Sequence, residues 1–267
     1  MKMNSRAQRL ESENSTIEAM VRRAHPALRR AMKLIRRPEA RVAVAPSPIG
    51  KLLVAEGPRG LVTVHFLAVR DPERTLEMLR QRFDLVENQP STAELRRCIE
   101  RYFAGDLRVL SHPVDLSLVA SDFQRRALTR LRAVPAGAVI TYHALAAAVG
   151  EPDAQRAIGN TMASNPIPIF VPCHRVIKSD GTIGNYGGGV DRKIVLLRNE
   201  GFVVKRDLKL PERSVLGHSK TRIFCRPECF AAKRAAQFNQ LIFADAAHAR
   251  RAGLRPCKLC RPEAESV

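Results

Sequence analysis

Two pairs of cysteines near the C-terminal end place the tightest constraint on how this 267-residue chain can fold. Cys225 and Cys229 form a CxxxC pair, and Cys257 and Cys260 form a CxxC pair that begins after 27 intervening residues. Four thiolates at these spacings suit a single tetrahedral Zn²⁺ ion, and two disulfides are the alternative. The segment is too short for a large core, so bound metal would also help it to fold. We predict a zinc module over residues 218–267.

The charge distribution predicts a polyanionic partner. The chain has 45 lysines and arginines against 26 acidic residues, a formal net charge of +19. The excess lies in residues 1–38, 121–204 and 205–267, whereas residues 39–120 are balanced. A solvated charged face would explain any one of these segments. Three basic segments around a neutral one favour nucleic acid.

The sequence predicts no membrane partner and no secretory leader. Its longest uncharged window, residues 133–150, contains proline, glycine and polar residues, so it does not read as a membrane span. The first residues are basic without an apolar region after them. We therefore expect a cytoplasmic, nucleoid-associated protein. A reducing compartment favours zinc over disulfides for the cysteine pairs.

The residue pattern predicts a mixed α/β (α+β) chain. Residues 1–38 read as a basic extension, helical or disordered, and residues 205–217 read as a polar linker. The region 39–120 has three β-branched runs followed by two amphipathic segments. We predict strands at residues 41–45, 50–56 and 60–67, and helices at residues 72–83 and 92–103.

Residues 121–204 contain a predicted helix–turn–helix. A helix at residues 123–131 is followed by one that Thr141 would cap and Gly150 would end, then by a turn and a helix over residues 154–164. The last helix is rich in small residues, and Arg156 is its only charged residue. Small residues let a backbone approach DNA closely, and one arginine can probe between bases. The alternative is two ordinary packed helices.

The stretch over residues 167–176 combines an apolar run with a cysteine and a histidine. The run predicts a buried strand that Pro172 ends. Cys173 and His174 are adjacent, so they can cooperate only if the chain turns there. An imidazole beside a thiol favours the nucleophilic thiolate. A structural cysteine beside an unrelated histidine is the alternative.

Four motifs in this half of the chain resemble the O6-alkylguanine-DNA alkyltransferase family. The resemblance implies an RNase H-like β/α scaffold over residues 39–120 and a helical catalytic domain with the helix–turn–helix over residues 121–204. The motifs are Arg156-Ala157-Ile158-Gly159-Asn160, Asn165-Pro166-Ile167-Pro168, Pro172-Cys173-His174-Arg175-Val176 and Gly184-Asn185-Tyr186-Gly187-Gly188-Gly189.

The resemblance implies a single-turnover methyltransferase that repairs double-stranded DNA containing O6-alkylguanine, and O4-alkylthymine as well. A monomer would bind the minor groove, flip the damaged nucleotide and move its alkyl group irreversibly to Cys173. His174 would be the base, supported by Glu200 through a water, and Tyr142 would protonate the leaving guanine. Asn165 would order the active-site turn. The remaining implied residues are Arg156, Ala157, Gly159 and Asn160 for DNA, and Met162, Val176, Tyr186, Gly187 and Gly188 for the guanine pocket.

The C-terminal module resembles the Ada-type metal-binding domain in the residues around both cysteine pairs. That resemblance implies DNA contact and makes Cys225 a candidate acceptor of methyl groups from phosphotriesters. The module departs from the pattern because it follows the alkyltransferase region and because Phe230-Ala231-Ala232 stands where arginines are usual. Two alternatives for the whole chain are a non-catalytic lesion-binding protein, which the presence of Cys173 disfavours, and a damage-sensing regulator.

Overall fold

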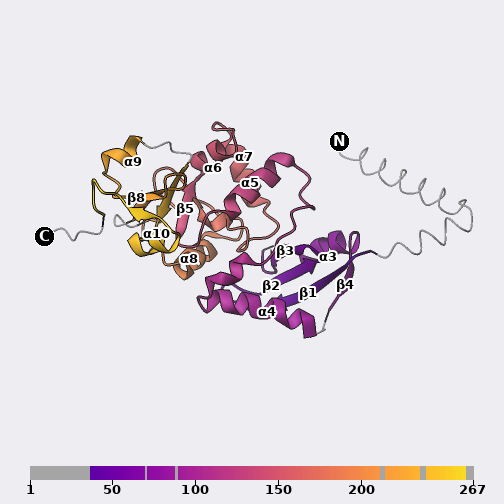
Figure 1. Cartoon of the computed structure of the whole chain (residues 1–267). Helices are drawn as coiled ribbons and strands as arrows, with labels where there is room; N and C mark the ends of the chain where they lie inside the picture. Colours follow the sequence, from indigo (N-terminus) through magenta and orange to yellow (C-terminus); the bar gives the residue numbers. More distant parts are fainter. Residues whose placement is uncertain (1–36, 70, 88–89, 211–213, 235–238, 263–267) are drawn as a thin grey trace, which may run out of the picture. The chain divides into compact units, whose positions relative to one another are not determined.

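Short runs of β-branched and small apolar residues build the first sheet of the computed structural model (Figure 1). The structure describes residues 37–69, 71–87, 90–210, 214–234 and 239–262. The predicted basic extension over residues 1–38 lies outside these residues except for its last two. From Glu39 onward the chain packs as one unit.

The first sheet has four strands in the order β3-β2-β1-β4. β2 pairs antiparallel with β1 and β3, while β4 pairs parallel with β1. The three predicted strands and two predicted helices are confirmed, with small shifts at their ends, and β4 is additional. The elements are β1 (Glu39–Ala45), β2 (Leu52–Gly57), β3 (Gly60–Phe66), α3 (Pro72–Arg80), β4 (Asp84–Val86) and α4 (Pro90–Phe103).

The edge strand β3 supports the segment that leads to Cys173. The backbone N–H of Val64 donates to the Pro166 carbonyl at 2.9 Å, and Thr63 Oγ1 donates to the same oxygen at 3.0 Å. At the start of the strand, the Leu61 N–H donates to the Pro113 carbonyl at 2.9 Å. These bonds satisfy the unpaired side of an edge strand and fix residue 166 in space.

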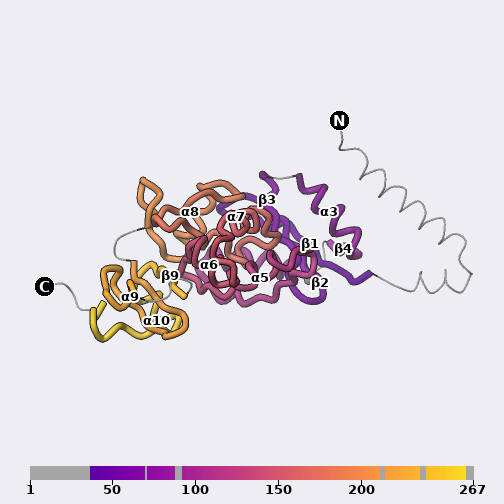
Figure 2. Tube along the Cα trace, turned by 90° about the horizontal axis from the view of Figure 1, so that it is seen from above, coloured from indigo at the N-terminus to yellow at the C-terminus, as the bar shows by residue number. Residues whose placement is uncertain are grey.

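Helices dominate the middle of the chain, as predicted. The Thr141 side chain caps α6 by accepting from the Ala144 N–H, and Gly201 follows α8 with φ of +92°. Helices α5, α6 and α7 pack on one another (Figure 2). The elements are η1 (Leu107–Ser111), α5 (Asp122–Arg132), β5 (Ala138–Thr141), α6 (Tyr142–Ala148), α7 (Gln155–Ala163), η2 (Cys173–Arg175), β6 (Val176–Ile177) and α8 (Val190–Asn199).

The predicted strand within residues 167–171 is wrong. The run is buried, but it folds into a compact turn in which the Val171 N–H donates to the Ile167 carbonyl at 2.9 Å. Ile169 adopts φ of 77°. Pro166 and Pro168 have no N–H to donate, so the run cannot form a regular ladder. The apolar composition of this run correctly indicated that it is buried, but it did not indicate its backbone conformation.

The C-terminal module extends a second sheet, whose order is β10-β8-β7-β9-β5-β6. β9 pairs antiparallel with β5, and β5 pairs parallel with β6. Residues 215–217 of the predicted linker lie in β7. The elements are β7 (Val215–His218), β8 (Ile223–Cys225), α9 (Phe230–Arg234), β9 (Gln240–Phe243), α10 (Ala246–Arg251) and β10 (Arg255–Pro256).

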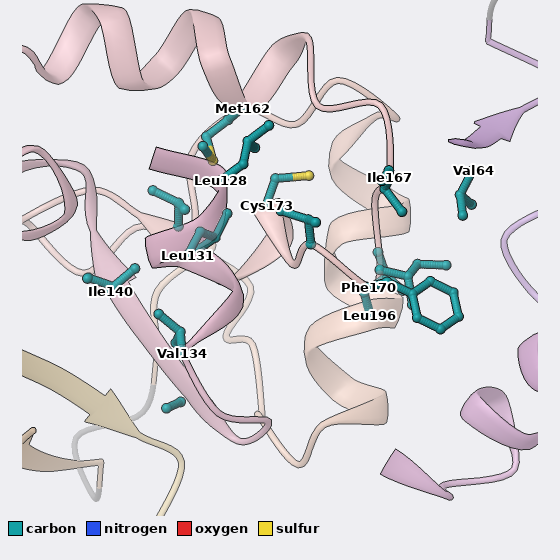
Figure 3. Close-up of a cluster of buried hydrophobic side chains, with 14 of the residues drawn as sticks. Val64, Leu128, Leu131, Val134, Ile140, Met162, Ile167, Phe170, Cys173 and Leu196 are labelled. Atoms are coloured by element: carbon teal, nitrogen blue, oxygen red, sulfur yellow. The ribbon is translucent and has the colours of Figure 1, made fainter. Parts of the chain in front are cut away.

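One buried cluster joins these parts of the molecule. It includes Leu52 of β2, Ile99 of α4, Leu128 of α5, Cys173 of η2 and Phe243 of β9. Figure 3 shows a part of it, in which Cys173 is surrounded by apolar side chains from several elements. No helix among the described residues is both long and apolar enough to cross a bilayer.

The contact between β3 and Pro113 generates a stability prediction. Gly60 has φ of +123°, and a Cβ at this position would overlap the Pro113 backbone. Gly60→Ala is expected to lower the free energy of unfolding by about 2 kcal/mol or more. Gly105→Ala is the matched control, because Gly105 has φ of +88° but open space around it. Its expected cost is about 1 kcal/mol. Urea unfolding measures both, and equal losses would contradict the close contact.

Candidate active site and metal centre

A short 3₁₀ turn brings Cys173 and His174 to the same region of the core. The Arg175 N–H donates to the Pro172 carbonyl at 2.9 Å, which bends the chain directly after the proline. Asn165 holds the preceding turn: its Nδ2 donates to the Val171 carbonyl at 2.7 Å, and its Oδ1 accepts from the Ile167 N–H at 3.0 Å. Because the chain turns here, the two adjacent side chains need not point to opposite faces, as they would on a strand. The sequence predicted such a turn only as a condition for Cys173 and His174 to cooperate.

Cys173 lies at the wall of a cavity of about 210 Å³. Five predicted site residues line it together with Cys173: Met162, Asn165, Tyr186, Gly187 and Gly188. Val176 does not line this cavity; it is fully buried in β6, opposite Ile140. The cavity also has a wall that the sequence did not predict, made by β3 and the neighbouring α3: Thr63, Val64, His65, Phe66, Thr75 and Met78.

The Cys173 side chain is protonated in its resting environment. Only 4% of the residue is exposed, and burial raises the pKa of its thiol. Hydrogen bonding with Asn165 and Tyr186 and the positive charge of Lys193 act in the opposite direction. The Tyr186 hydroxyl lies 3.9 Å from Sγ. A thiolate at this position therefore needs a base to take its proton.

His174 follows Cys173 in the same turn. It is fully buried, and its Nε2 lies 2.9 Å from Oε1 of Glu200. A carboxylate can only accept, so Nε2 carries the hydrogen and Nδ1 presents a lone pair. Within the described part of the chain, Nδ1 has no hydrogen-bond partner. Burial lowers the pKa of His174, which keeps the imidazole neutral near pH 7.

Glu200 contacts His174 directly, not through a water as the family resemblance implied. Burial opposes its ionisation, but the charge of Arg175 and the hydrogen bonds from His174 and Arg175 hold the pKa of the carboxyl well below its usual range. Arg175 donates from Nε and Nη2 at 2.7 Å each, so the two side chains form a bidentate ion pair. The Tyr102 hydroxyl adds a bond of 3.0 Å. The residue pattern of α4 did not predict this contact.

Lys193 is a charged group that the sequence did not predict as part of the site. It is fully buried in α8 and donates from Nζ to the carbonyls of Val176, at 2.6 Å, and Ile183. Burial lowers its pKa to about 8. Its spacing offered a signal, because Lys193 shares the apolar face of α8 with Leu196 and Leu197.

The second helix of the helix–turn–helix presents its predicted DNA face to solvent. Arg156 and Asn160 are exposed, Ala157 and Gly159 are partly exposed, and a Cβ at Gly159 would meet nothing within 4 Å. A cavity of about 570 Å³ opens beside this helix. Tyr142 lines this cavity together with Arg156, not the cavity at Cys173, and burial raises the pKa of its phenol.

The four C-terminal cysteines converge on one point, as predicted. Their sulfur atoms all lie within 4.8 Å of one another. Zn–S bonds of about 2.3 Å place tetrahedral ligands about 3.8 Å apart, so the set fits Zn²⁺ after a small contraction. Backbone N–H groups, chiefly that of Cys260, lower the pKa of Cys257 to about 7. Amide groups directed at a sulfur favour the thiolate that a metal requires.

Three family models match successive parts of the chain. The ribonuclease-like domain of 6-O-methylguanine DNA methyltransferase matches residues 41–116, and the DNA-binding domain of the same protein matches residues 122–202. The metal-binding domain of Ada matches residues 201–263. Together these models cover both the Cys173 site and the four cysteines.

Individual relatives agree with the family models. A methylated-DNA–protein-cysteine methyltransferase of Methanosarcina acetivorans is 37% identical over 159 residues, which cover 60% of this chain and 97% of the relative. The bifunctional transcriptional activator/DNA repair enzyme Ada of Escherichia coli is 34% identical over 161 residues, 60% of this chain but only 45% of Ada.

A solved structure gives the same result for the fold. The crystal structure of Mycobacterium tuberculosis O6-methylguanine methyltransferase is 32% identical, with a TM-score of 0.50, and the match covers 60% of this chain and 92% of that chain. The resemblance that the motifs predicted is confirmed, and the chain belongs to the methylated-DNA–protein-cysteine methyltransferase family, with an Ada-type metal-binding domain at its C-terminal end.

Proposed function

We propose that this protein repairs DNA by direct reversal, moving an alkyl group from O6 of guanine to Cys173. One observation carries the proposal: Cys173 faces a cavity and stands next in sequence to a neutral, buried histidine whose orientation Glu200 fixes. The names of the relatives support the same reaction. By the same chemistry we propose O4-alkylthymine as a second substrate.

The geometry supports a balanced transfer. His174 Nδ1, which has no hydrogen-bond partner among the described residues, takes the thiol proton of Cys173 through one water, and the imidazolium is stabilised by Glu200. The thiolate attacks the alkyl carbon, so a C–S bond forms as the C–O bond breaks. The pair of electrons from the broken bond stays on guanine, and Tyr142 supplies a proton to that anion. The thioether has no reversal step, so each molecule acts once.

We further propose how the chain meets its substrate. A monomer binds double-stranded DNA through α7 in the minor groove, where the exposed Arg156 occupies the space left by the flipped nucleotide. The family-model ranges support a scaffold over residues 39–120 and a catalytic domain over residues 121–204. The metal-binding model begins at residue 201, so it supports a zinc module that includes the predicted linker over residues 205–217 as well as the residues from 218 onward. The protein would work in the cytoplasm, at the nucleoid.

Mass spectrometry tests the main proposal. After incubation with O6-methylguanine DNA, one methyl group is expected on the tryptic peptide over residues 157–175, in which Cys173 is the only cysteine. Cys173→Ala should bind the DNA and acquire no methyl group, because Cys173 provides the only thiol among the described residues that line the cavity. Cys98→Ala is the matched control, since burial raises the pKa of that thiol to about 11. An unmethylated wild-type chain would refute the proposal.

Lys193 generates a pH prediction. Its ammonium is charged below about pH 8 and favours the Cys173 thiolate. Lys193→Met is expected to slow single-turnover transfer about tenfold at pH 7, because the Cys173 pKa rises further. The deficit should shrink above pH 8, where wild-type Lys193 also loses its charge. Thermal melting controls for folding. A deficit of equal size at every pH would contradict the electrostatic role.

A second acceptor is a separate proposal that rests on the zinc module. Cys225 lines an apolar cavity of about 430 Å³ whose lining also includes Arg255 and Lys258. Two cations beside a thiolate suit a phosphate backbone. Bound Zn²⁺ would hold Cys225 as an electron-rich thiolate. Such a module would aid DNA binding and accept a methyl group from a phosphotriester.

Labelling with a methylphosphotriester oligonucleotide tests this second role. A methyl group is expected on Cys225, located by fragmentation of its tryptic peptide, and Cys173→Ala should still acquire it. Arg255→Ala together with Lys258→Ala should lower the labelling rate without loss of zinc, because neither side chain is a metal ligand. Labelling of Cys257 in place of Cys225 would contradict the proposal.

A further inference from the structure

The zinc module and the Cys173 site share one sheet. β9 of the module pairs antiparallel with β5, through Ala138 opposite Phe243. β5 in turn pairs with β6, which begins directly after the turn that carries Cys173 and His174. The Ala244 N–H extends the pairing by donating to the Gly137 carbonyl at 3.1 Å. Backbone hydrogen bonds therefore run without interruption from the metal module to the reacting cysteine.

The apolar core is shared as well. Phe224, Phe243 and Ala249 are fully buried and belong to the same cluster as Cys173 and Val134. A hinged accessory domain would have its own separate core. Here the module covers one side of the alkyltransferase core, so loss of the module would expose apolar surface next to the site.

His248 makes the most specific contact across this boundary. Its ring packs against two backbone segments at once, because a Cβ at Gly137 or at Gly201 would overlap ring atoms. Both glycines have positive φ, +77° and +92°. The ring is fixed in turn by Asp245, which caps α10 and accepts from Nδ1 at 2.8 Å. Only 14% of the His248 side chain is exposed.

The two segments under His248 hold the two ends of the buried ion pair. Gly201 directly follows Glu200, whose carboxylate orients His174. Gly137 closes the turn after Val134, whose carbonyl accepts from Nη1 of Arg175 at 2.5 Å. Movement of either segment would change the distance between Arg175 and Glu200, and with it the orientation of the imidazole.

We propose that the zinc module is a structural part of the alkyl-transfer site, and that His248 is a positioning residue that clamps the Gly137 and Gly201 segments around the Arg175–Glu200 ion pair. The cysteine cluster holds β8 and β10 together, and these strands support β7 and β9. The inference rests on the proposed role of Cys173. It assigns the module a task on the base-repair reaction itself, separate from any chemistry at Cys225.

Hydrogen–deuterium exchange on the full-length, zinc-loaded chain tests the clamp. His248→Ala is expected to speed amide exchange in residues 134–140 and 197–204, while β1 and β2 keep their protection. Ala247→Gln is the matched control, because Ala247 is exposed on the same helix. Extraction of zinc with a chelator should produce the same local change. Unchanged exchange in both segments, or an equal loss of protection in β1 and β2, would overturn the proposal.

Transfer kinetics provide the second readout. His248→Ala is expected to slow single-turnover methyl transfer at saturating DNA about tenfold, because the imidazole loses its fixed orientation. The pH dependence of the transfer rate should also shift, because Glu200 then fixes the orientation of the His174 ring less firmly. His248→Asn, whose amide nitrogen takes the place of Nδ1 and can keep the bond to Asp245, should recover part of the rate. A His248→Ala profile identical to wild type would overturn the proposal. Amide exchange is measured without damaged DNA. A chain without transfer activity would therefore refute the proposed function, and the exchange data would still test the clamp.

Discussion

The carboxylate of Glu200 is the group on which the site depends. It is fully buried, and it receives hydrogen bonds from Arg175, His174 and Tyr102. A buried carboxylate without partners would be protonated or would destabilise the fold, whereas this one is compensated by a bidentate guanidinium. Because Arg175 already balances its charge, Glu200 can hold His174 without forcing it to become positive.

That balance explains how a thiol with a raised pKa can still react. Burial raises the pKa of Cys173 and lowers that of His174, so neither group is ionised at rest. In the proposed reaction a proton passes from Cys173 to His174 and creates two opposite charges. The charge of Lys193 favours the thiolate, and Glu200 accepts the hydrogen bond of the imidazolium. The charges are stabilised only when the reaction forms them, which is the condition for catalysis.

The sequence predicted the components of this site better than their connections. Cys173, Asn165 and the metal cysteines lie in short local motifs, and turn or ligand chemistry acts over a few residues. The direct contact from Glu200 to His174 depends on how α8 packs, which spacing along the chain does not encode. Tyr102 shows the same limit, since an aromatic on an apolar helix face gives no sign that its hydroxyl reaches a carboxylate.

The fold shows a parallel division. Strands β1 to β3 and the capped helix after Thr141 follow from residue pattern and capping. The run at residues 167–171 was predicted as a strand from its hydrophobicity, although its prolines disfavour a strand. The second sheet could not be predicted, because β9 pairs with β5 across about a hundred residues, and such pairing is decided by tertiary packing.

A buried network of charges also explains why extra packing is useful at this site. Arg175, Lys193 and Glu200 occupy positions that apolar residues could fill at lower cost, so the surrounding core must hold them in one arrangement. The scaffold sheet supports one side of the active-site turn through Pro166. The opposite side of β5 would otherwise be an exposed edge, and β9 covers it. The chain continues from the end of α8 into the module, so a module that follows the catalytic domain can reach that edge. Its position after the catalytic domain therefore suits the pairing of β9 with β5.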